Sequence, residues 1–266
     1  RSVLELSAYA RSVHDANASA VRQWKNAELA KPPSKQRASG TMSKVATFNA
    51  EYFNYLQDKE IIDDSLTNPF RGVRFKPFAS KASYVALTLQ EIMTVRDASV
   101  KAGDNELTAF IDLGRYTGMR IAEIAALTSE SVVSVENVQC FKVKDDAKTK
   151  ASAGRLVPIA PALVKLMKAS GYSLDAFDLG KRHDAVSKRF GRLKRAVLED
   201  GTSRTKVFHS LRKYVATTLE QAGLSEGVAA DLLGHEKQTI TFGVYSAGSS
   251  LEQLQDAVKK LARAQG

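Results

Sequence analysis

The sequence predicts a mainly α-helical protein: an all-α N-terminal domain, a linker, and an α+β domain with one small antiparallel sheet. Three observations lead to this prediction. The chain has 266 residues, more than one typical domain holds. Its apolar residues recur mostly at helical spacing, and strand-like alternation is confined to one region. A stretch with two prolines and no period separates the two parts.

Three helical runs are expected in the N-terminal domain, residues 1–77. They are "VLELSAYARSVHDAN", "AVRQWKNAEL" and "VATFNAEYFNYLQDKEII", and a break with two prolines and a glycine separates the second from the third. The third run carries an apolar stripe that we expect in the core: Phe48, Tyr52, Tyr55 and Leu56.

The stretch "NPFRGVRFKPFASKAS", residues 68–83, indicates a connection between domains. It alternates aromatic and basic residues around two prolines. We therefore place a linker at 78–85 and the second domain at 86–266.

The second domain is expected to be helical around one hairpin. Thr88 and Glu91 form a capping-box pattern ahead of an apolar run, and helices follow through residue 128. "NVQCFKVK" and "GRLVPI" alternate as strands around the loop "DDAKTKASA". Further helices are expected at 160–170, 183–199 and 209–222, with a short one ending at Gly234.

The charge balance favours a polyanionic partner. The chain has 39 Lys+Arg against 29 Asp+Glu, a net charge of +10, and a pI near 9.6. Cys140 is the single cysteine, which excludes an intrachain disulfide and favours a reducing, intracellular compartment. No apolar stretch is long enough for a membrane span, so we expect no membrane partner. The chain starts at Arg1, which suggests that an N-terminal piece precedes it.

Basic residues that would suit phosphate contact occur in the N-terminal break, the linker and the helix "AVSKRFGRLKRAVLE". A merely solvated basic surface is the alternative for each of them. The candidates for contact with the phosphates of a nucleic acid are Lys35, Arg37, Arg71, Arg74, Lys76, Lys188, Arg189 and Arg192.

Two helix starts carry candidate chemistry. "HSLRKYVATTLEQAGL" puts His209 and Arg212 on one face. "YTGMRIAEIAAL" puts Arg120 in a first turn, with Glu123 three residues on. A surface ion pair is the simple interpretation of Arg120 and Glu123. The helix dipole nevertheless disfavours a cation at this end, and a bound anion would remove the conflict.

The remaining candidates lie in loops. "DLLGHEKQT" ends a helix at Gly234, His235 follows, and Tyr245 comes ten residues later. The four histidines and one cysteine lack metal-ligand spacing, so no metal site is expected. The hairpin loop adds three cations: Lys148, Lys150 and Arg155.

These pieces in this order resemble the tyrosine recombinase family, the site-specific recombinases of the phage-integrase type. The similar text is "TGMRIAEIAALT", "KTKASAGRLVPI", "HSLRKYVATTL", "LLGH" and "YS", over roughly residues 86–250. The N-terminal helical domain is similar in length and type to the family's core DNA-binding domain, and the second domain would then be the catalytic domain.

The resemblance implies a role for each matched residue. Arg120 and Arg212 would bind the scissile phosphate, and Glu123 would support them. Tyr245 would be the nucleophile. The hairpin lysine would be Lys148 by motif text, but many members place it eight residues before the proline of the second strand, which selects Lys150. The full implied catalytic set is Arg120, Lys148, His209, Arg212, His235 and Tyr245.

The implied function is a site-specific DNA recombinase or integrase that cleaves and rejoins strands through a covalent 3′-phosphotyrosine, without a cofactor. The implied partners are double-stranded DNA and further copies of the chain, a dimer to tetramer on DNA, with the C-terminal helix 251–264 as a candidate contact. The implied location is the cytoplasm of a bacterial cell or of the host of a phage or mobile element. The alternatives are DNA relaxation of the type IB topoisomerase kind and an inactive DNA-binding protein.

Overall fold

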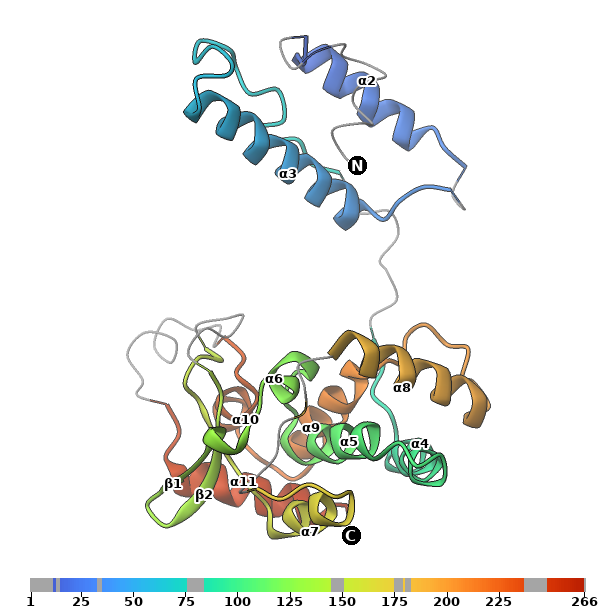
Figure 1. Cartoon of the computed structure of the whole chain (residues 1–266), viewed down its shortest axis with the longest axis vertical. Helices are drawn as coiled ribbons and strands as arrows, with labels where there is room; N and C mark the ends of the chain where they lie inside the picture. The colour runs from blue at the N-terminus through green and yellow to red at the C-terminus, as the bar shows by residue number, and fades with distance from the viewer. Residues whose placement is uncertain are drawn as a thin grey trace. The chain divides into compact units, whose positions relative to one another are not determined.

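The computed structural model describes residues 12, 15–32, 35–75, 84–144, 151–174, 179, 183–236 and 248–265. The chain divides into two compact units, unit 1 (Arg1–Ala82) and unit 2 (Ser83–Gly266), and the division falls among the residues expected to link two domains. The secondary structure described in unit 1 is helical, and unit 2 combines helices with one small antiparallel sheet at its side (Figure 1). This confirms the predicted fold class.

Unit 1 is built on α2 (Ala18–Leu29) and α3 (Ser39–Asp58). The side chain of Asn17 caps α2 by accepting the N–H groups of Ser19 and Ala20 at 2.9 and 3.0 Å. Between the helices lies an apolar core in which Trp24 meets Phe75 edge to face, with ring centroids 5.6 Å apart.

The prediction that Phe48, Tyr52, Tyr55 and Leu56 form the core stripe of unit 1 is wrong for three of the four residues, because they lie on the exposed face of α3. Phe48, Tyr52 and Tyr55 are 57%, 38% and 52% exposed, and only Leu56 of the four is buried. The buried residues of α3 are Met42, Ala46, Asn49, Phe53 and Leu56, which recur at steps of three and four. Two apolar stripes compete on this helix. The sequence alone does not say which one meets α2.

Unit 2 contains eight α-helices among its described residues. Several of their ends show clear caps: Thr88 and Glu91 form the expected capping box at the start of α4, and Gly118 and Gly234 end α5 and α10 in the left-handed conformation. The helices are α4 (Leu89–Lys101), α5 (Asn105–Thr117), α6 (Ile121–Ala125), α7 (Pro161–Ala169), α8 (His183–Val197), α9 (His209–Gln221), α10 (Glu226–Leu233) and α11 (Leu251–Arg263).

The sheet has three antiparallel strands in the order β1-β2-β3: β1 (Val132–Val135), β2 (Val138–Lys142) and β3 (Leu156–Pro158). The sequence pattern predicted β2 and β3 and missed β1. The missed signal is the turn: Glu136 and Asn137 both have positive φ, 49° and 64°, as a two-residue hairpin turn requires. Cys140 faces Val133 on one side and Pro158 on the other.

Helix α5 lies at the centre of unit 2. Every residue from Leu107 to Thr117 is buried, because α4, α7, α8, α9 and α11 all pack against it. Its buried Asp112 accepts hydrogen bonds from Arg96 at 2.8 Å and Arg115 at 2.9 Å, so the buried carboxylate is paired with two guanidiniums. A rigid, fully covered α5 fixes the turn at Gly118 that leads into the candidate site.

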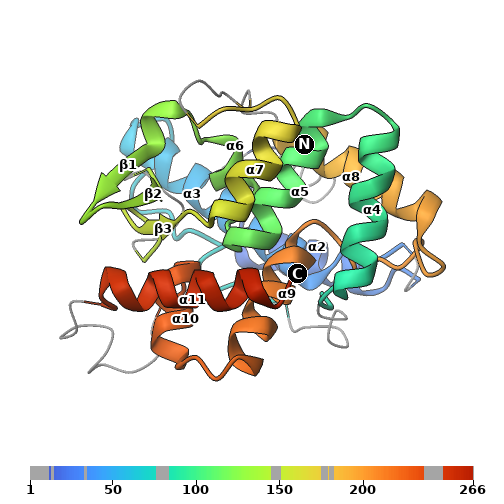
Figure 2. The same ribbon diagram turned by 90° about the horizontal axis from the view of Figure 1, so that it is seen from below.

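The C-terminal helix α11 packs on its own unit. Leu254, Val258 and Leu261 are buried in the main core, and α11 contacts α10, β3, α9 and α5 (Figure 2). Beyond it, Gln265 exchanges two hydrogen bonds of 2.8 Å with Arg115. The apolar face of this helix, expected as a candidate contact between copies, therefore has its partner within the same chain.

Candidate functional site

Four segments that are distant in sequence meet where α10 ends. They are the turn before α6, the hairpin arm before β3, the start of α9, and α10 itself. Gly118 makes the turn with φ at 63°, and a Cβ there would lie 2.4 Å from a side-chain carbon of Leu233 and 3.0 Å from Val215. Only glycine permits this close approach of the α5–α6 turn to α9 and α10.

Three arginines bind the last three carbonyls of the α10 end, one each. Arg155 Nε donates to Leu232 O at 3.2 Å, Arg212 Nη2 donates to Leu233 O, and Arg120 Nη2 donates to Gly234 O at 3.2 Å. The last carbonyls of a helix lack backbone donors and carry the negative end of its dipole, so they attract cations. The helix end thus assembles three guanidiniums that come from three other segments.

The dipole conflict expected at Arg120 is resolved by this arrangement. Its backbone is the N-cap of α6, while its guanidinium reaches away to the opposite, carbonyl end of α10. The first turn of α6 instead carries the carboxylate of Glu123, which the dipole favours at this end of a helix.

Glu123 is the counter-charge of the cluster. It accepts the backbone N–H of Arg120 at 2.8 Å and Arg120 Nη1 at 2.7 Å, and Arg155 Nη2 binds it at 2.8 Å. Burial alone would raise the pKa of this carboxyl, but the hydrogen bonds and charges of Arg155 and Arg120 outweigh it and bring the pKa to about 2. Glu123 is therefore ionised at any pH above that range.

Ser152 and Arg155 are site residues to which the sequence patterns assigned no role. The buried Ser152 hydroxyl accepts from Arg120 Nη1 and donates to Gly234 O at 3.2 Å. A Cβ on Gly234 would lie 2.7 Å from the Ser152 hydroxyl and 2.8 Å from Arg155 Nη1. In the sequence, the only indication of a role for Arg155 is its basic side chain beside a predicted hairpin. Ser152 lies among small residues, and nothing in the sequence pattern indicates a role for it.

Arg212 is the most enclosed cation of the site. It is 3% exposed and donates to Gly118 O at 2.9 Å. Burial and the positive charge of Arg120 lower its pKa to about 9. Among the described residues no carboxylate forms an ion pair with it. A bound anion would therefore relieve an electrostatic cost that the free protein bears.

His209 and His235 flank the two arginines and are exposed to solvent. Desolvation by the surrounding protein, together with the charges of Arg212 and Arg120, lowers the pKa of both, that of His235 to about 4. Both imidazoles are neutral at pH 7 and can each donate one hydrogen bond and accept another. The ring of Tyr84 lies edge-on to His209, with centroids 6.2 Å apart, a neighbour that the sequence did not suggest.

Tyr245, Lys148, Lys150 and Lys76 lie outside the described residues. The residues that follow the hairpin loop in sequence are described, and two of them, Ser152 and Arg155, make hydrogen bonds within the arginine cluster. On the far side of the tyrosine, Ser249 hydrogen-bonds to Asp231 of α10. Both undescribed segments therefore begin or end at the candidate site.

The candidate DNA contacts divide into two groups. Arg37 is paired with Glu28 at 3.0 Å. Arg189 is paired with Asp104 at 3.0 Å and with Glu106. These two arginines have carboxylate partners within the chain. The others among the described residues are exposed: Lys35, Arg71, Arg74, Lys188 and Arg192.

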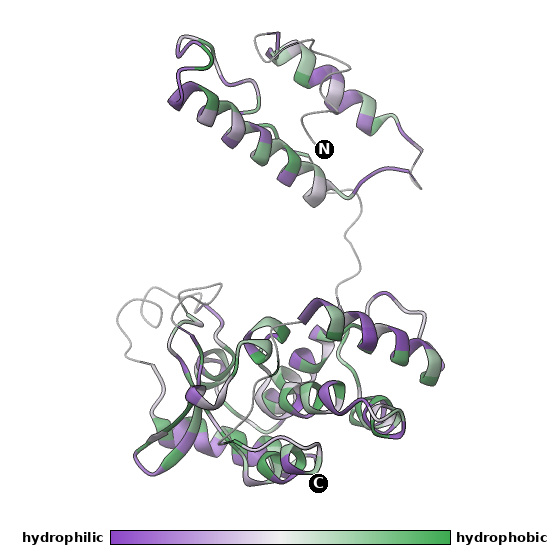
Figure 3. Cartoon of the chain, viewed as in Figure 1, coloured by the Kyte–Doolittle hydropathy of each residue, from purple (hydrophilic) through white to green (hydrophobic). Residues whose placement is uncertain are grey.

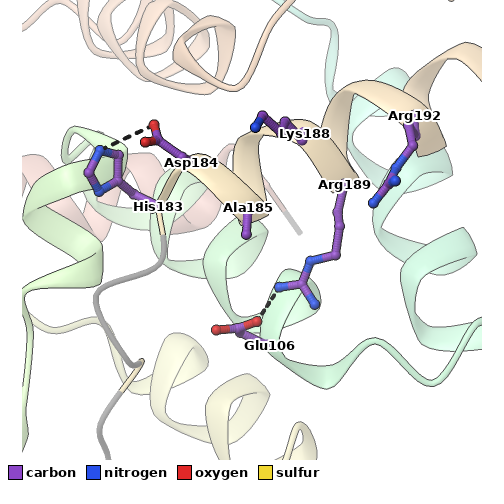
Figure 4. A pocket seen from close by; sticks show the side chains of 7 residues that line it. All are labelled: Glu106, His183, Asp184, Ala185, Lys188, Arg189 and Arg192. Atoms are coloured by element: carbon purple, nitrogen blue, oxygen red, sulfur yellow. Dashed lines mark hydrogen bonds and ion pairs between the residues drawn. The ribbon is translucent and has the colours of Figure 1, made fainter.

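Helix α8 lines a groove of about 570 Å³ with its basic side chains. Figure 4 shows Arg189 directed at Glu106, with Lys188 and Arg192 beside it on the same helix. Much of α8 is coloured hydrophilic in Figure 3, although Val186 and Phe190 anchor it in the core. The helix thus presents a cationic edge while it is held by apolar contacts.

The described part of the chain holds neither a cluster of metal-binding side chains nor a helix that could span a membrane. No group of three His, Cys, Asp or Glu side chains gathers there as metal ligands would. No described helix combines the length and the apolar character needed to cross a bilayer.

Comparison with known proteins identifies the family. The model of the phage integrase family matches residues 86–251. A tyrosine recombinase of Pseudothermotoga lettingae is 26% identical over 244 residues, covering 88% of this chain and 79% of that protein.

Two solved structures share the fold. A lambda integrase dimer bound to a COC′ core site aligns with a TM-score of 0.57 at 19% identity, over 85% of this chain and 81% of that one. The integrase of the transposon Tn1549, in complex with transposon right-end DNA, aligns with a TM-score of 0.56 at 18% identity, over 94% and 87%. Because the family match spans more than half of the chain and includes the whole arginine cluster, this chain belongs to the phage integrase family of tyrosine recombinases.

Proposed function

We propose that this recombinase breaks and rejoins DNA strands at the end of α10, with Tyr245 as nucleophile and Arg120 and Arg212 as the phosphate-binding pair. The observation that carries the proposal is the placement of these two guanidiniums on adjacent carbonyls, those of Gly234 and Leu233. A guanidinium has five N–H donors. Arg212 donates one each to two backbone carbonyls, and its other donors have no partner within the described residues.

The residue types suit phosphoryl transfer. The planar forks of Arg120 and Arg212 match two phosphate oxygens each and remain charged through the reaction. A tyrosine hydroxyl has an ordinary pKa of about 10, and nearby cations favour its ionised form. Removal of one preorganised donor to a developing anion costs on the order of 3 kcal/mol of barrier.

The reaction proceeds as an exchange of esters. Tyr245 Oη forms a bond to phosphorus, the bond from phosphorus to the 5′-oxygen breaks, and that oxygen takes a proton from the hairpin lysine. The tyrosine's own proton passes to a neutral histidine, His209 or His235, or to solvent. A free 5′-hydroxyl then attacks the 3′-phosphotyrosine and reverses the steps, so resealing needs no ATP.

A nicked suicide substrate tests the nucleophile. Cleavage close to the nick releases a short fragment and traps the covalent complex. We expect an adduct with the native chain and none with Tyr245→Phe, while the DNA affinity stays unchanged. An adduct formed by Tyr245→Phe would overturn the assignment, and its absence from both chains would indicate an inactive DNA-binding protein.

Cleavage of the same nicked substrate shows which of Lys148 and Lys150 is the general acid. We expect one of Lys148→Ala and Lys150→Ala to cleave slowly and the other to serve as its matched control. If the slow variant lacks the general acid, a substrate with sulfur in place of the bridging 5′-oxygen should restore its rate, because a thiolate leaves without a proton. A slow variant that sulfur does not rescue would remove the general-acid role.

For DNA binding we propose that both units contribute. Unit 1 supplies Lys35, Arg71 and Arg74, and α8 supplies Lys188 and Arg192, as phosphate contacts that set affinity and orientation. DNA would be met in the cytoplasm of the cell that carries the gene.

We further propose assembly of copies on DNA, up to a tetramer, which supports strand exchange in preference to relaxation. Solved relatives of the same fold include a lambda integrase tetramer bound to a Holliday junction. The stripe of α11 is already buried in its own unit, so contact in trans through this helix would require it to leave that core. Truncation after Ser250 that leaves assembly on DNA intact would exclude α11 as the contact, and relaxation of supercoiled DNA by a monomer would favour the topoisomerase alternative.

A further inference from the structure

Helix α10 also holds the chain where it returns from the tyrosine segment. The backbone N–H and the hydroxyl of Ser249 both donate to one carboxylate oxygen of Asp231, each at 2.7 Å. Asp231 lies within α10, one residue before the first of the three carbonyls that bind the arginines. The next residue, Ser250, caps α11 in a reciprocal pair with Gln253.

The departing end of the same segment is held by the same helix. His235 N–H donates to Ala230 O at 2.9 Å, after Gly234 has turned the chain with φ at 69°. Both ends of the segment that contains Tyr245 are thus attached within one turn of α10.

The attachment limits where the tyrosine can be. Tyr245 lies four positions before Ser249 in the sequence, and each step spans at most about 3.6 Å, so their Cα atoms lie within about 14 Å of each other. If Ser249 were free, the next fixed residue would be Ser250, the N-cap of α11, five residues from Tyr245. The Asp231–Ser249 contact therefore adds a direct attachment to α10 and ends the tether of the nucleophile one residue earlier on this side.

We propose that Asp231 is a positioning residue. By binding Ser249 it attaches the segment that carries Tyr245 to α10, the helix whose carbonyls also hold Arg120 and Arg212. This inference rests on the proposed function of Tyr245. Fixing a backbone residue costs conformational entropy, and a tether fixed beforehand lowers that cost at the moment of attack. Asp231 acts on the reaction through the position of Tyr245 and not by contact with the phosphate.

Single-turnover cleavage of the nicked substrate at saturating DNA tests the proposal. We expect Asp231→Ala to lower the cleavage rate constant about tenfold, with the DNA dissociation constant and the final amount of adduct unchanged. Religation from a preformed adduct should keep its rate, because the tyrosine is then already joined to the phosphate. A purely structural role would instead lower the amount of active protein and leave the rate constant of the remaining fraction unchanged.

Variants of Ser249 test the same contact without a substitution at Asp231, so the test does not depend on correct folding of Asp231→Ala. Ser249→Ala loses one of the two donors and should be intermediate, whereas Ser249→Thr keeps both and should restore the native rate. Ser250→Ala is the matched control: it removes the adjacent α11 cap and should leave the cleavage rate constant unchanged.

The outcomes separate this inference from the function on which it rests. Native rate constants in both Asp231→Ala and Ser249→Ala, or equal slowing in Ser250→Ala, would overturn the positioning role while the adduct at Tyr245 stands. Loss of the adduct in the native chain, or its persistence in Tyr245→Phe, would overturn the proposed function itself.

Discussion

Replacement of Glu123 by glutamine would remove the counter-charge of two guanidiniums and keep the shape of the side chain. Glu123 is 9% exposed, so solvent does not take over its role. Its pKa falls from 4.5 to about 2 in the folded protein. At about 1.4 kcal/mol for each pKa unit, its ionisation stabilises the fold by about 3 kcal/mol at neutral pH. Removing one partner of a buried ion pair costs about 3–5 kcal/mol in other proteins, which agrees.

The pH dependence identifies the cause. A carboxyl whose pKa is depressed on folding contributes stability above its unfolded pKa, and this contribution is lost as the pH falls through the folded value. We therefore expect Glu123→Gln to be less stable than the native chain by about 3 kcal/mol at pH 7 and by roughly half as much at pH 3. Other groups titrate alike in both chains and cancel in the difference.

Urea unfolding followed by far-ultraviolet circular dichroism measures this difference. The single tryptophan, Trp24, lies buried in unit 1, so its fluorescence reports unit 1 separately and should be unaffected. Glu220→Gln, an exposed glutamate on α9, is the matched control and should cost less than about 0.5 kcal/mol. A loss below about 1 kcal/mol at pH 7, or an equal loss at pH 7 and pH 3, would refute the reasoning.

Three further predictions follow from the geometry. Gly234→Ala should cost about 2 kcal/mol more than Gly171→Ala in thermal unfolding, because both positions have positive φ but a Cβ meets side-chain atoms at 2.7–2.8 Å only at Gly234; equal costs would exclude the overlap. Because the pKa of His235 is lowered to about 4, the free protein should lose stability as the pH falls below 6.5. DNA phosphate should favour the protonated form, so DNA affinity should rise about tenfold between pH 7 and pH 5, and His235→Gln should flatten that titration. Joint replacement of Lys188 and Arg192 by alanine should reduce the slope of log affinity against log salt by about 2, and an unchanged slope would remove them from the DNA contact.

Local sequence patterns predicted the parts of the fold that depend on near neighbours. Thr88 and Glu91 cap α4 as their spacing indicates, and Gly234 ends α10 where the apolar run ends. Such features are decided within a turn of helix, so a short window contains all the interacting atoms. Strand β1 was missed because four residues offer too little alternation to identify.

The face of α3 depended on packing that no local pattern contains. Phe48 and Phe53 lie on the same helix, and both stripes have helical spacing, but only Phe53 meets the rest of unit 1. Likewise Arg37 and Arg189 read as free basic residues in the sequence, and their carboxylate partners come from Glu28 on a preceding helix and from Asp104 and Glu106, more than eighty residues away.

From the sequence alone, the order and the chemical types of the candidate site residues could be predicted: two arginines, two histidines, a hairpin lysine and a tyrosine, in a series typical of one enzyme family. The contacts that hold the described members of this set are visible only in the folded chain. Arg155, Ser152 and the carbonyl end of α10 enter the site because buried donors and acceptors must find partners, and those partners lie up to 114 residues away in sequence. The sequence predicts which groups would do the chemistry, and the folded chain positions the described ones through long-range hydrogen bonds.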